Sequence, residues 1–294
     1  MVLGLLVAGV MVVDLVFFTW GALATNTSST PLVVTGVTQW AALSRQVVGA
    51  DLRVASLLSD PNADPHEHEA TMRDAARVAQ ASVVILNGAG YDTWLSQLVT
   101  NATTRITTID VADLVHVRTG SNPHLFYNPL AAIAFVRALR TSLDSRYGFS
   151  GVDVRAAQLL ASLDATQARV VAIRRACAGV AVSATEDVTT YLLHDAGLRV
   201  VTPEALRLAV GNGVDPTVGD LALSLAQLKD HPAFLIDNVQ TQTPLTAELV
   251  AQAQRFHVPV IRVTETMRGN DYVRWIDAEI GQLESALAKE GCWK

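Results

Sequence analysis

Two short segments place histidine in the same local setting and carry much of the chemistry in this sequence. One is Asp64-Pro65-His66-Glu67-His68 and the other is Asn122-Pro123-His124. In each, proline disfavours helix at the residue before it, so we expect the imidazoles of His66 and His124 to lie at strand-to-helix turns. Imidazole nitrogen held at a loop on a rigid α/β frame is a common ligand of transition metals. The two segments therefore predict a metal site.

Two acidic residues in the second half of the chain have a comparable setting. Glu186 comes just after a predicted strand, and Asp271 follows the last predicted strand. Ligands of open parallel sheets bind outside the carboxyl ends of the strands, so His66, His124, Glu186 and Asp271 can all face one cleft. Two imidazoles and two carboxylates suit Zn²⁺, Mn²⁺ or Fe²⁺. Four protein ligands leave no open position for a catalytic water, which argues against an enzyme.

The elements that would position these residues alternate between short β-branched runs and longer amphipathic stretches. This order predicts parallel sheets with helices on both faces. The stretch from Asp153 to Ala176 has no internal glycine or proline and predicts one long, stiff helix. We therefore expect an α/β protein of two similar lobes (30–151 and 178–294) joined by that helix (152–177), with the metal site in the cleft. The expected strands are 32–37, 52–58, 82–86, 105–110, 180–183, 198–202, 233–237 and 258–263, and the expected helices are 39–48, 70–80, 93–100, 128–147, 153–176, 189–195, 217–229, 244–256 and 271–289.

Composition and charge exclude one class of partner. Half of the 294 residues are hydrophobic and 17% are charged, which is enough apolar material for two buried cores. The formal net charge is −6. Nucleic-acid binding requires basic stripes, so we expect no nucleic acid as a partner.

The first 29 residues predict export. Residues 2–24 are almost wholly apolar and end in Ala22-Leu23-Ala24 before a polar stretch, as at a signal-peptide cleavage site. No lysine or arginine precedes Arg45, which departs from the usual charged start. The segment is therefore a signal peptide whose true start lies upstream, or an uncleaved anchor of the ~20 residues that span a bilayer. A buried core helix is the remaining alternative. The expected location is the periplasm or the cell surface.

The two cysteines leave two alternatives open. In an oxidising compartment, Cys177 and Cys292 are candidates for a disulfide that ties the C-terminal tail to the second lobe. Two packed, unpaired thiols are the other alternative, because sequence does not give the geometry that a disulfide requires.

Three ordered motifs resemble those of the zinc/manganese-type (cluster A-I) solute-binding proteins of bacterial metal ABC transporters. Residues 64–69 (DPHEHE) resemble the family's DPHEYE motif, and residues 87–95 (NGAGYDTWL) resemble its NGLGLEPWL segment. Residues 122–129 (NPHLFYNP) resemble its (D/N)PHxWxDP motif. The resemblance runs from about Pro31 to the C-terminus. It implies two α/β lobes bridged by one long helix.

The resemblance also implies a ligand set and a function. It implies His66, His124 and Glu186 as metal ligands, and a glutamate at the third position fits the manganese-like variant. For the fourth ligand, alignment on the neighbouring glycine and tyrosine matches Asn270, whereas the chemistry favours its anionic neighbour Asp271, which we choose. The implied protein is an extracytoplasmic substrate-binding protein that captures Zn²⁺ or Mn²⁺ and delivers it to an ABC permease in the membrane.

Less specific interpretations of the same residues remain. Glu186 is also suited to the N-terminus of a helix, where the dipole favours a carboxylate. An uncleaved N-terminal segment would favour a surface-anchored metal-binding or adhesion protein. A zinc hydrolase would use His66, His124 and Glu186 with Asp271 as general base, but it needs an open metal position, and the sequence has no H-E-x-x-H motif on a helix. We expect the His68 side chain to be solvated, or to lie next to the ligands without itself binding the metal.

Overall fold

A computed structural model of the chain describes residues 30–60 and 68–293. The predicted export segment, residues 1–29, and the predicted ligand His66 lie outside the described residues. Within the described ranges, no helix is long and apolar enough to cross a membrane.

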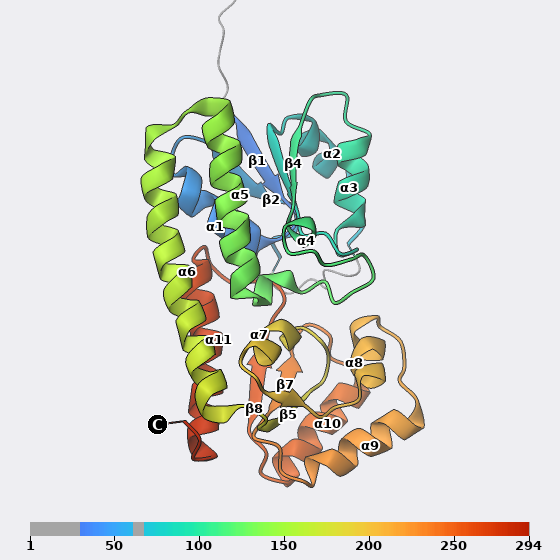
Figure 1. Cartoon of the computed structure of the whole chain (residues 1–294). Helices are drawn as coiled ribbons and strands as arrows, with labels where there is room; N and C mark the ends of the chain where they lie inside the picture. The colour runs from blue at the N-terminus through green and yellow to red at the C-terminus, as the bar shows by residue number, and fades with distance from the viewer. Residues whose placement is uncertain (1–29, 61–67, 294) are drawn as a thin grey trace, which may run out of the picture.

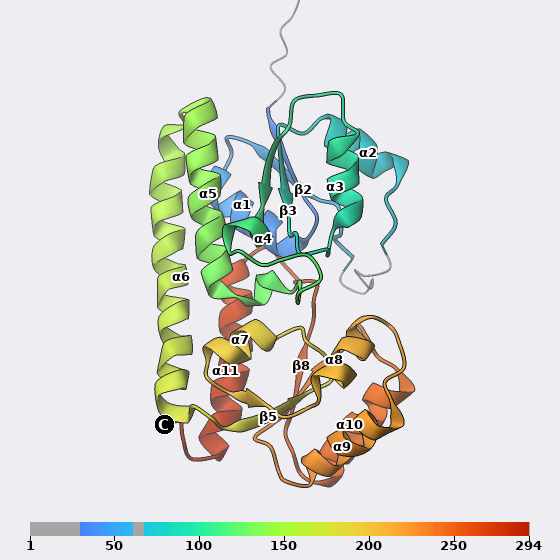
Figure 2. The same cartoon turned by 45° about the vertical axis from the view of Figure 1, so that its right-hand side comes forward.

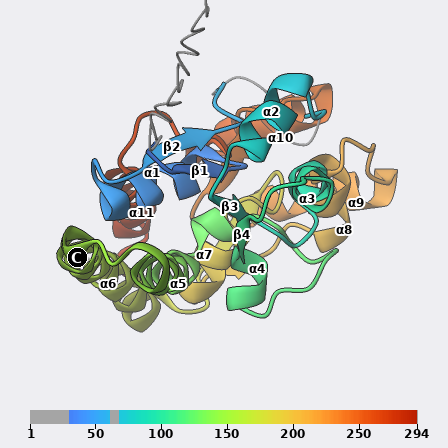
Figure 3. The same cartoon turned by 90° about the horizontal axis from the view of Figure 1, so that it is seen from above.

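The first lobe is built on a four-stranded parallel sheet in the order β2-β1-β3-β4 (Figure 1). Its two central strands are buried on both faces, which explains why they are continuous apolar runs without alternation. Successive side chains point to opposite faces, and Figure 3 shows α5 and α6 on one side of this sheet and α2 and α3 on the other. The elements are β1 (Leu32–Thr35), α1 (Thr38–Val48), β2 (Arg53–Ser56), α2 (Met72–Ala79), β3 (Val83–Leu86), α3 (Thr93–Thr100), β4 (Thr107–Asp110), α4 (Val111–Leu114), the 3₁₀ turn η2 (Leu125–Tyr127) and α5 (Pro129–Tyr147).

The second lobe repeats this plan. Its parallel sheet has the order β6-β5-β7-β8, so the first strand of each lobe pairs with the second on one side and the third on the other. The prediction of two similar α/β lobes is therefore confirmed. The elements are β5 (Ala181–Ala184), α7 (Thr190–Asp195), β6 (Arg199–Val200), α8 (Glu204–Gly211), α9 (Val218–Leu228), β7 (Leu235–Asn238), α10 (Pro244–Arg255), β8 (Val260–Val263) and α11 (Tyr272–Lys289).

A single long helix, α6 (Ser150–Cys177), joins the lobes. Its 28 residues extend for about 42 Å at 1.5 Å per residue. It packs on α1 and α5 in the first lobe and on α7 in the second, and Figures 1 and 2 show it running along one side of both lobes with α11 beside it. Arg169 of α6 forms ion pairs with Asp277 (3.0 Å) and Glu284 (2.7 Å) of α11. The two helices therefore form a common spine for the molecule.

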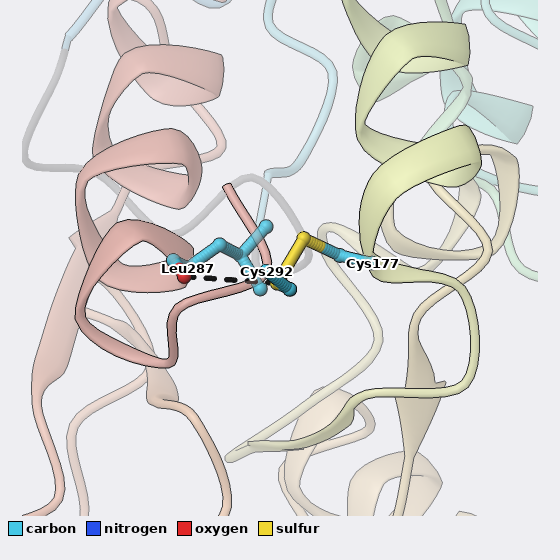
Figure 4. Close-up of a disulfide and its surroundings, with 3 residues drawn as sticks. All are labelled: Cys177, Leu287 and Cys292. Atoms are coloured by element: carbon cyan, nitrogen blue, oxygen red, sulfur yellow. Dashed lines mark hydrogen bonds between the residues drawn. A yellow bond between two sulfur atoms is a disulfide. The ribbon is translucent and has the colours of Figure 1, made fainter. Parts of the chain in front are cut away.

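A disulfide closes the end of this spine. Cys177, the last residue of α6, is bonded to Cys292, three residues after α11, with their Cα atoms 5.3 Å apart (Figure 4). The Sγ of Cys292 also lies 3.6 Å from the carbonyl oxygen of Leu287. Of the two alternatives that the sequence left open, the structure shows the bonded pair.

The lobes meet at the carboxyl ends of their strands and are linked there by hydrogen bonds. Three tyrosine hydroxyls donate to main-chain carbonyls across the boundary: Tyr127 to Thr264 (2.9 Å), Tyr191 to Asn122 (2.6 Å) and Tyr272 to Phe126 (2.9 Å). The first and last of these tyrosines are fully buried. The boundary is therefore a packed, directional contact.

Two helices of the described chain, the four-residue α4 and the longer α8, lie where the sequence analysis expected none. Helix α8 begins directly after Pro203 and buries Leu206 and Val210 on one face. Proline beside a helix start, followed by Glu204 in the first turn, is a helix-start signal that the strand-centred interpretation of this region overlooked. Strand β6 is correspondingly short, with only two residues.

Candidate metal site between the lobes

The turn after β3 is hydrogen-bonded to the second histidine segment and holds it in place. The side chain of Asn87 donates to the carbonyl oxygen of Pro123 (2.8 Å) and accepts from the indole nitrogen of Trp40 (3.1 Å). The next residue, Gly88, has a φ of +77°, and a Cβ atom there would clash with Asp110. The turn therefore fixes the backbone that presents His124.

The imidazole of His124 is oriented by Asn122. Oδ1 of Asn122 accepts from the main-chain nitrogen of His124 (3.0 Å) and lies 2.7 Å from its ring Nδ1. The amide nitrogen of Asn122 donates to the carbonyl oxygen of Asp187 (2.8 Å), which identifies the atom facing the ring as oxygen. Nδ1 of His124 is therefore hydrogen-bonded to Asn122, and Nε2 is the ring nitrogen at the junction between the lobes.

Two carboxylates from the second lobe lie at the same junction. Glu186 follows β5 and Glu265 follows β8, and each is 1% exposed. Oε2 of Glu265 is 3.3 Å from Nε2 of His124. The side-chain nitrogen of Asn238, at the end of β7, donates to Oε1 of both carboxylates, with 2.8 Å to Glu265 and a shorter contact to Glu186. An imidazole nitrogen and two carboxylates therefore meet where the lobes join.

Burial makes one of these carboxyl groups hard to ionise. The pKa of Glu186 is raised to about 7, first by desolvation and then by the neighbouring charge of Glu265, while His124 and Asn238 act in the opposite direction. Its Oε2 atom is buried and has no hydrogen-bond partner among the described residues. A cation placed beside Glu186 would offset both penalties, which is the electrostatic setting expected of a metal ligand.

Glu265 is held by contacts from both lobes. From the first lobe, the hydroxyl of Tyr91 donates to its Oε2 (3.1 Å) and the side-chain amide of Gln39 donates to its main-chain carbonyl. From the second lobe, Oε1 of Gln240 accepts from the main-chain nitrogens of Glu265 (2.6 Å) and Thr266 (2.9 Å). The segment after β8 is therefore held in place by hydrogen bonds from both lobes.

A cavity of about 420 Å³ opens beside His124. Its floor includes Tyr91, and its second-lobe wall includes a buried ion pair between Asp187 and Arg207. Asp187 directly follows Glu186 and also accepts from the hydroxyl of Thr190 (2.7 Å). The ion pair therefore anchors the backbone that carries Glu186 at the wall of this cavity.

The structure brings together two of the four predicted ligands. His124 and Glu186 lie at the junction, and His66 falls outside the described residues. Asp271 is elsewhere: it is exposed, caps the N-terminus of α11 by accepting from the main-chain nitrogen of Arg274 (3.1 Å), and accepts from the Gln46 side chain (3.4 Å). In this structure the Asp271 carboxylate serves as a helix cap and is not brought to the junction, and its role as a ligand stays a prediction.

Glu265 is a candidate ligand that the sequence analysis missed. A positional signal distinguishes it: Glu186 comes two residues after the end of β5, and Glu265 comes two residues after the end of β8. Equivalent positions after two parallel strands of the same sheet project to the same edge. His68 is also apart from the site, since its ring packs on Trp94 with the centroids 4.4 Å apart and its Nε2 lies 3.6 Å from Asp74.

In the described part of the chain, no three histidine, cysteine or acidic side chains are close enough together to hold a metal as they stand. The pairs are instead His124 with Glu265, and Glu186 with Glu265 through the amide of Asn238. His124, Glu186 and Glu265 are therefore candidate ligands that the structure brings together as pairs.

The family model for the zinc-uptake complex component A, a periplasmic protein, matches residues 33–286. The chain belongs to this family. Zinc-uptake component A proteins are the metal-binding components of uptake systems, and the resemblance seen in the three sequence motifs is thereby confirmed. No curated protein matches the chain in sequence.

Solved structures show the same fold as this member of the component A family. Similar structures include FpvC from Pseudomonas aeruginosa in complex with Mn²⁺ and the periplasmic zinc-binding protein TroA from Treponema pallidum. Each has a TM-score of 0.73 and 18% identity, over 88% of this chain and 99% of the other. Zn(II)-bound AdcA from Streptococcus pneumoniae has a TM-score of 0.68 and 19% identity, over 87% of this chain and 57% of its own. At these identities the likeness establishes the fold alone.

Proposed function

We propose that this protein captures a divalent transition metal outside the cytoplasm and delivers it to an ABC permease. The observation that supports the proposal is the meeting of His124 Nε2 with the buried carboxylates of Glu186 and Glu265 between the lobes. Buried like charges with little solvent are unfavourable without a cation, and an oriented imidazole lone pair adds nitrogen to the donor set. Membership of the component A family supports the same role.

The proposed ligands are His124, Glu186 and Glu265, with His66 as the fourth on the grounds of its sequence motif alone. This mixed nitrogen and oxygen set suits Zn²⁺ or Mn²⁺. The two carboxylates leave a bound divalent ion nearly neutral, which limits the cost of burying it. By the Irving–Williams order, Zn²⁺ binds such a site more tightly than Mn²⁺.

A transport role also accounts for the type of site. Four protein ligands fill a tetrahedral ion, so no position remains for the water that a metal hydrolase activates. We therefore propose a binding protein and not an enzyme. The ion is cargo, which the permease receives when the lobes loosen their contact.

Metal titration of the purified protein tests this function. Protein stripped with a chelator is titrated with Zn²⁺ and with Mn²⁺ in competition with a chromophoric chelator, beside the variant His124→Ala. We expect one equivalent of each metal to bind the natural protein, with tighter binding of zinc, and a large loss of affinity in the variant. Absence of binding, or identical affinity in the His124→Ala protein, would overturn the proposal.

A further inference from the structure

We propose that Asn238 is a positioning residue that holds Glu186 and Glu265 in place for the arriving ion. The inference rests on the proposed function, since it explains how the same site is prepared. Asn238 is fully buried and ends β7, which lies between β5 and β8 in the sheet. Because Glu186 follows β5 and Glu265 follows β8, only a side chain at the end of β7 lies between both carboxylates.

The orientation of the Asn238 amide is fixed by its own backbone surroundings. Its Oδ1 accepts from the main-chain nitrogen of Gln240 (3.1 Å), and its main-chain nitrogen donates to Oγ1 of Thr185 (3.3 Å). A flipped amide would lose the bond to Gln240 and point oxygen at two carboxylates. The nitrogen therefore faces the carboxylates, and each of its two hydrogens serves one of them.

One neutral donor thereby controls the distance between two like charges. Without it, Glu186 and Glu265 would repel each other in a setting with almost no solvent, and each would lose a hydrogen bond. The Gln240 side chain works in the same direction, because it accepts from the main-chain nitrogens of Glu265 and Thr266 and so holds the Glu265 backbone. The end of β7 thus fixes both the backbone and the side chain of the Glu265 ligand.

The amide leaves the outer oxygens of the pair for the ion. Asn238 contacts Oε1 of each glutamate, whereas Oε2 of Glu186 is buried without a partner and Oε2 of Glu265 faces His124 and accepts from the Tyr91 hydroxyl (3.1 Å). An ion bound at the Oε2 atoms would keep Asn238 as the outer partner of both carboxylates. Removal of such outer partners costs roughly 10–100-fold in metal affinity.

Two variants and a control test the role of Asn238. Asn238→Ala removes the donor and the bulk, whereas Asn238→Asp keeps the shape and the oxygen that accepts from Gln240 but replaces the donor with a third carboxylate. Asn101→Ala is the control: this exposed asparagine lies at the C-terminal end of α3 in the first lobe. Zinc and manganese affinities are measured by chelator competition at a temperature well below the melting temperature. The melting temperatures of the metal-free proteins are measured at pH 8.

For Asn238→Ala we expect roughly 10–100-fold weaker binding of both metals by protein with an unchanged near-ultraviolet circular dichroism spectrum. For Asn238→Asp we expect the metal-free protein to melt below Asn238→Ala, because three carboxylates then share one buried position. A merely structural role would lower the melting temperature and leave the affinity of folded protein unchanged, and that result would overturn the inference. A melting temperature of Asn238→Asp equal to that of the natural protein would also overturn the inference. If the natural protein itself binds no metal, the proposed function has failed instead.

Discussion

His124 Nε2 and Glu265 Oε2 lie 3.3 Å apart, although one belongs to the first lobe and the other to the second. Their side chains are only 4% and 0% exposed, so the contact is closed to bulk water. Neither lobe alone contains both kinds of donor among His124, Glu186 and Glu265. The proposed site therefore exists only when the lobes are in contact, and the geometry of their boundary sets the geometry of that site.

Substitution of Glu265 and of Asp271, each in its own variant, should show which of the two carboxylates binds the metal. We expect Glu265→Gln to weaken zinc binding by more than the roughly 100-fold upper range for outer partners, because a charged ligand is lost. We expect Asp271→Asn to leave affinity unchanged, since asparagine caps a helix about as well as aspartate. Chelator competition on both proteins measures this. Loss of zinc affinity in Asp271→Asn, with normal affinity in Glu265→Gln, would restore the sequence-based assignment.

The raised pKa of Glu186, about 7, predicts how the stability of the metal-free protein depends on pH. An acid whose pKa is higher when folded binds its proton more tightly in the folded state. Its burial therefore destabilises the fold as pH rises from the ordinary carboxyl range through about 7. Glu186→Gln cannot ionise, so we expect its melting temperature to exceed that of the natural protein increasingly over this range. A constant difference from pH 5 to pH 8 would contradict the assignment.

The disulfide should contribute strongly to stability. Cys177 and Cys292 are separated by 115 residues, and a loop of that size is stabilised by roughly 4–5 kcal/mol in the chain-entropy picture. We expect the double variant Cys177→Ser/Cys292→Ser to lose about 2–5 kcal/mol in urea unfolding. The natural protein with reductant serves as the matched comparison and should unfold like the variant. Equal midpoints with and without reductant would show that the bond does not stabilise the fold.

We expect the stability of the second lobe to depend on the presence of both partners of the Asp187–Arg207 ion pair. Removal of one partner from a buried pair costs about 3–5 kcal/mol, because the other charge is left buried and unpaired. We expect Arg207→Met to destabilise the second lobe by this order and to weaken metal binding, since Asp187 adjoins Glu186. The double variant Arg207→Met/Asp187→Asn should recover part of the stability. If the double variant is less stable than Arg207→Met in urea unfolding, the unpaired charge is not the cause.

The architecture could be predicted from sequence because it depends on local patterns. Runs such as Val83–Leu86 are apolar at every position, which is typical of strands buried on both faces. The long helix was predicted from an uninterrupted stretch, and it extends from Ser150 to Cys177. Short or irregular pieces, such as α8 after Pro203, carry too few periodic residues to stand out from the loops around them.

The site was harder to predict because ligand identity depends on which atoms meet in space. Asp271 has the features of a ligand in sequence, being acidic and directly before the last helix, but the same features describe an N-cap, and the structure shows the cap. Glu265 follows β8 as Glu186 follows β5, which becomes informative only once both strands are known to belong to one parallel sheet. Asn238 carries no sequence signal, since its importance arises from the strand order.

The disulfide between Cys177 and Cys292 (Figure 4) closes a covalent ring that contains all residues from the end of α6 to the C-terminal tail. A protease that nicks any loop of this ring would not release a fragment, and the severed halves would remain joined through sulfur. In a surrounding where hydrolytic enzymes are abundant, such a chain tolerates a first cut without losing its terminal helix. The same nicked protein would separate into two pieces only after reduction.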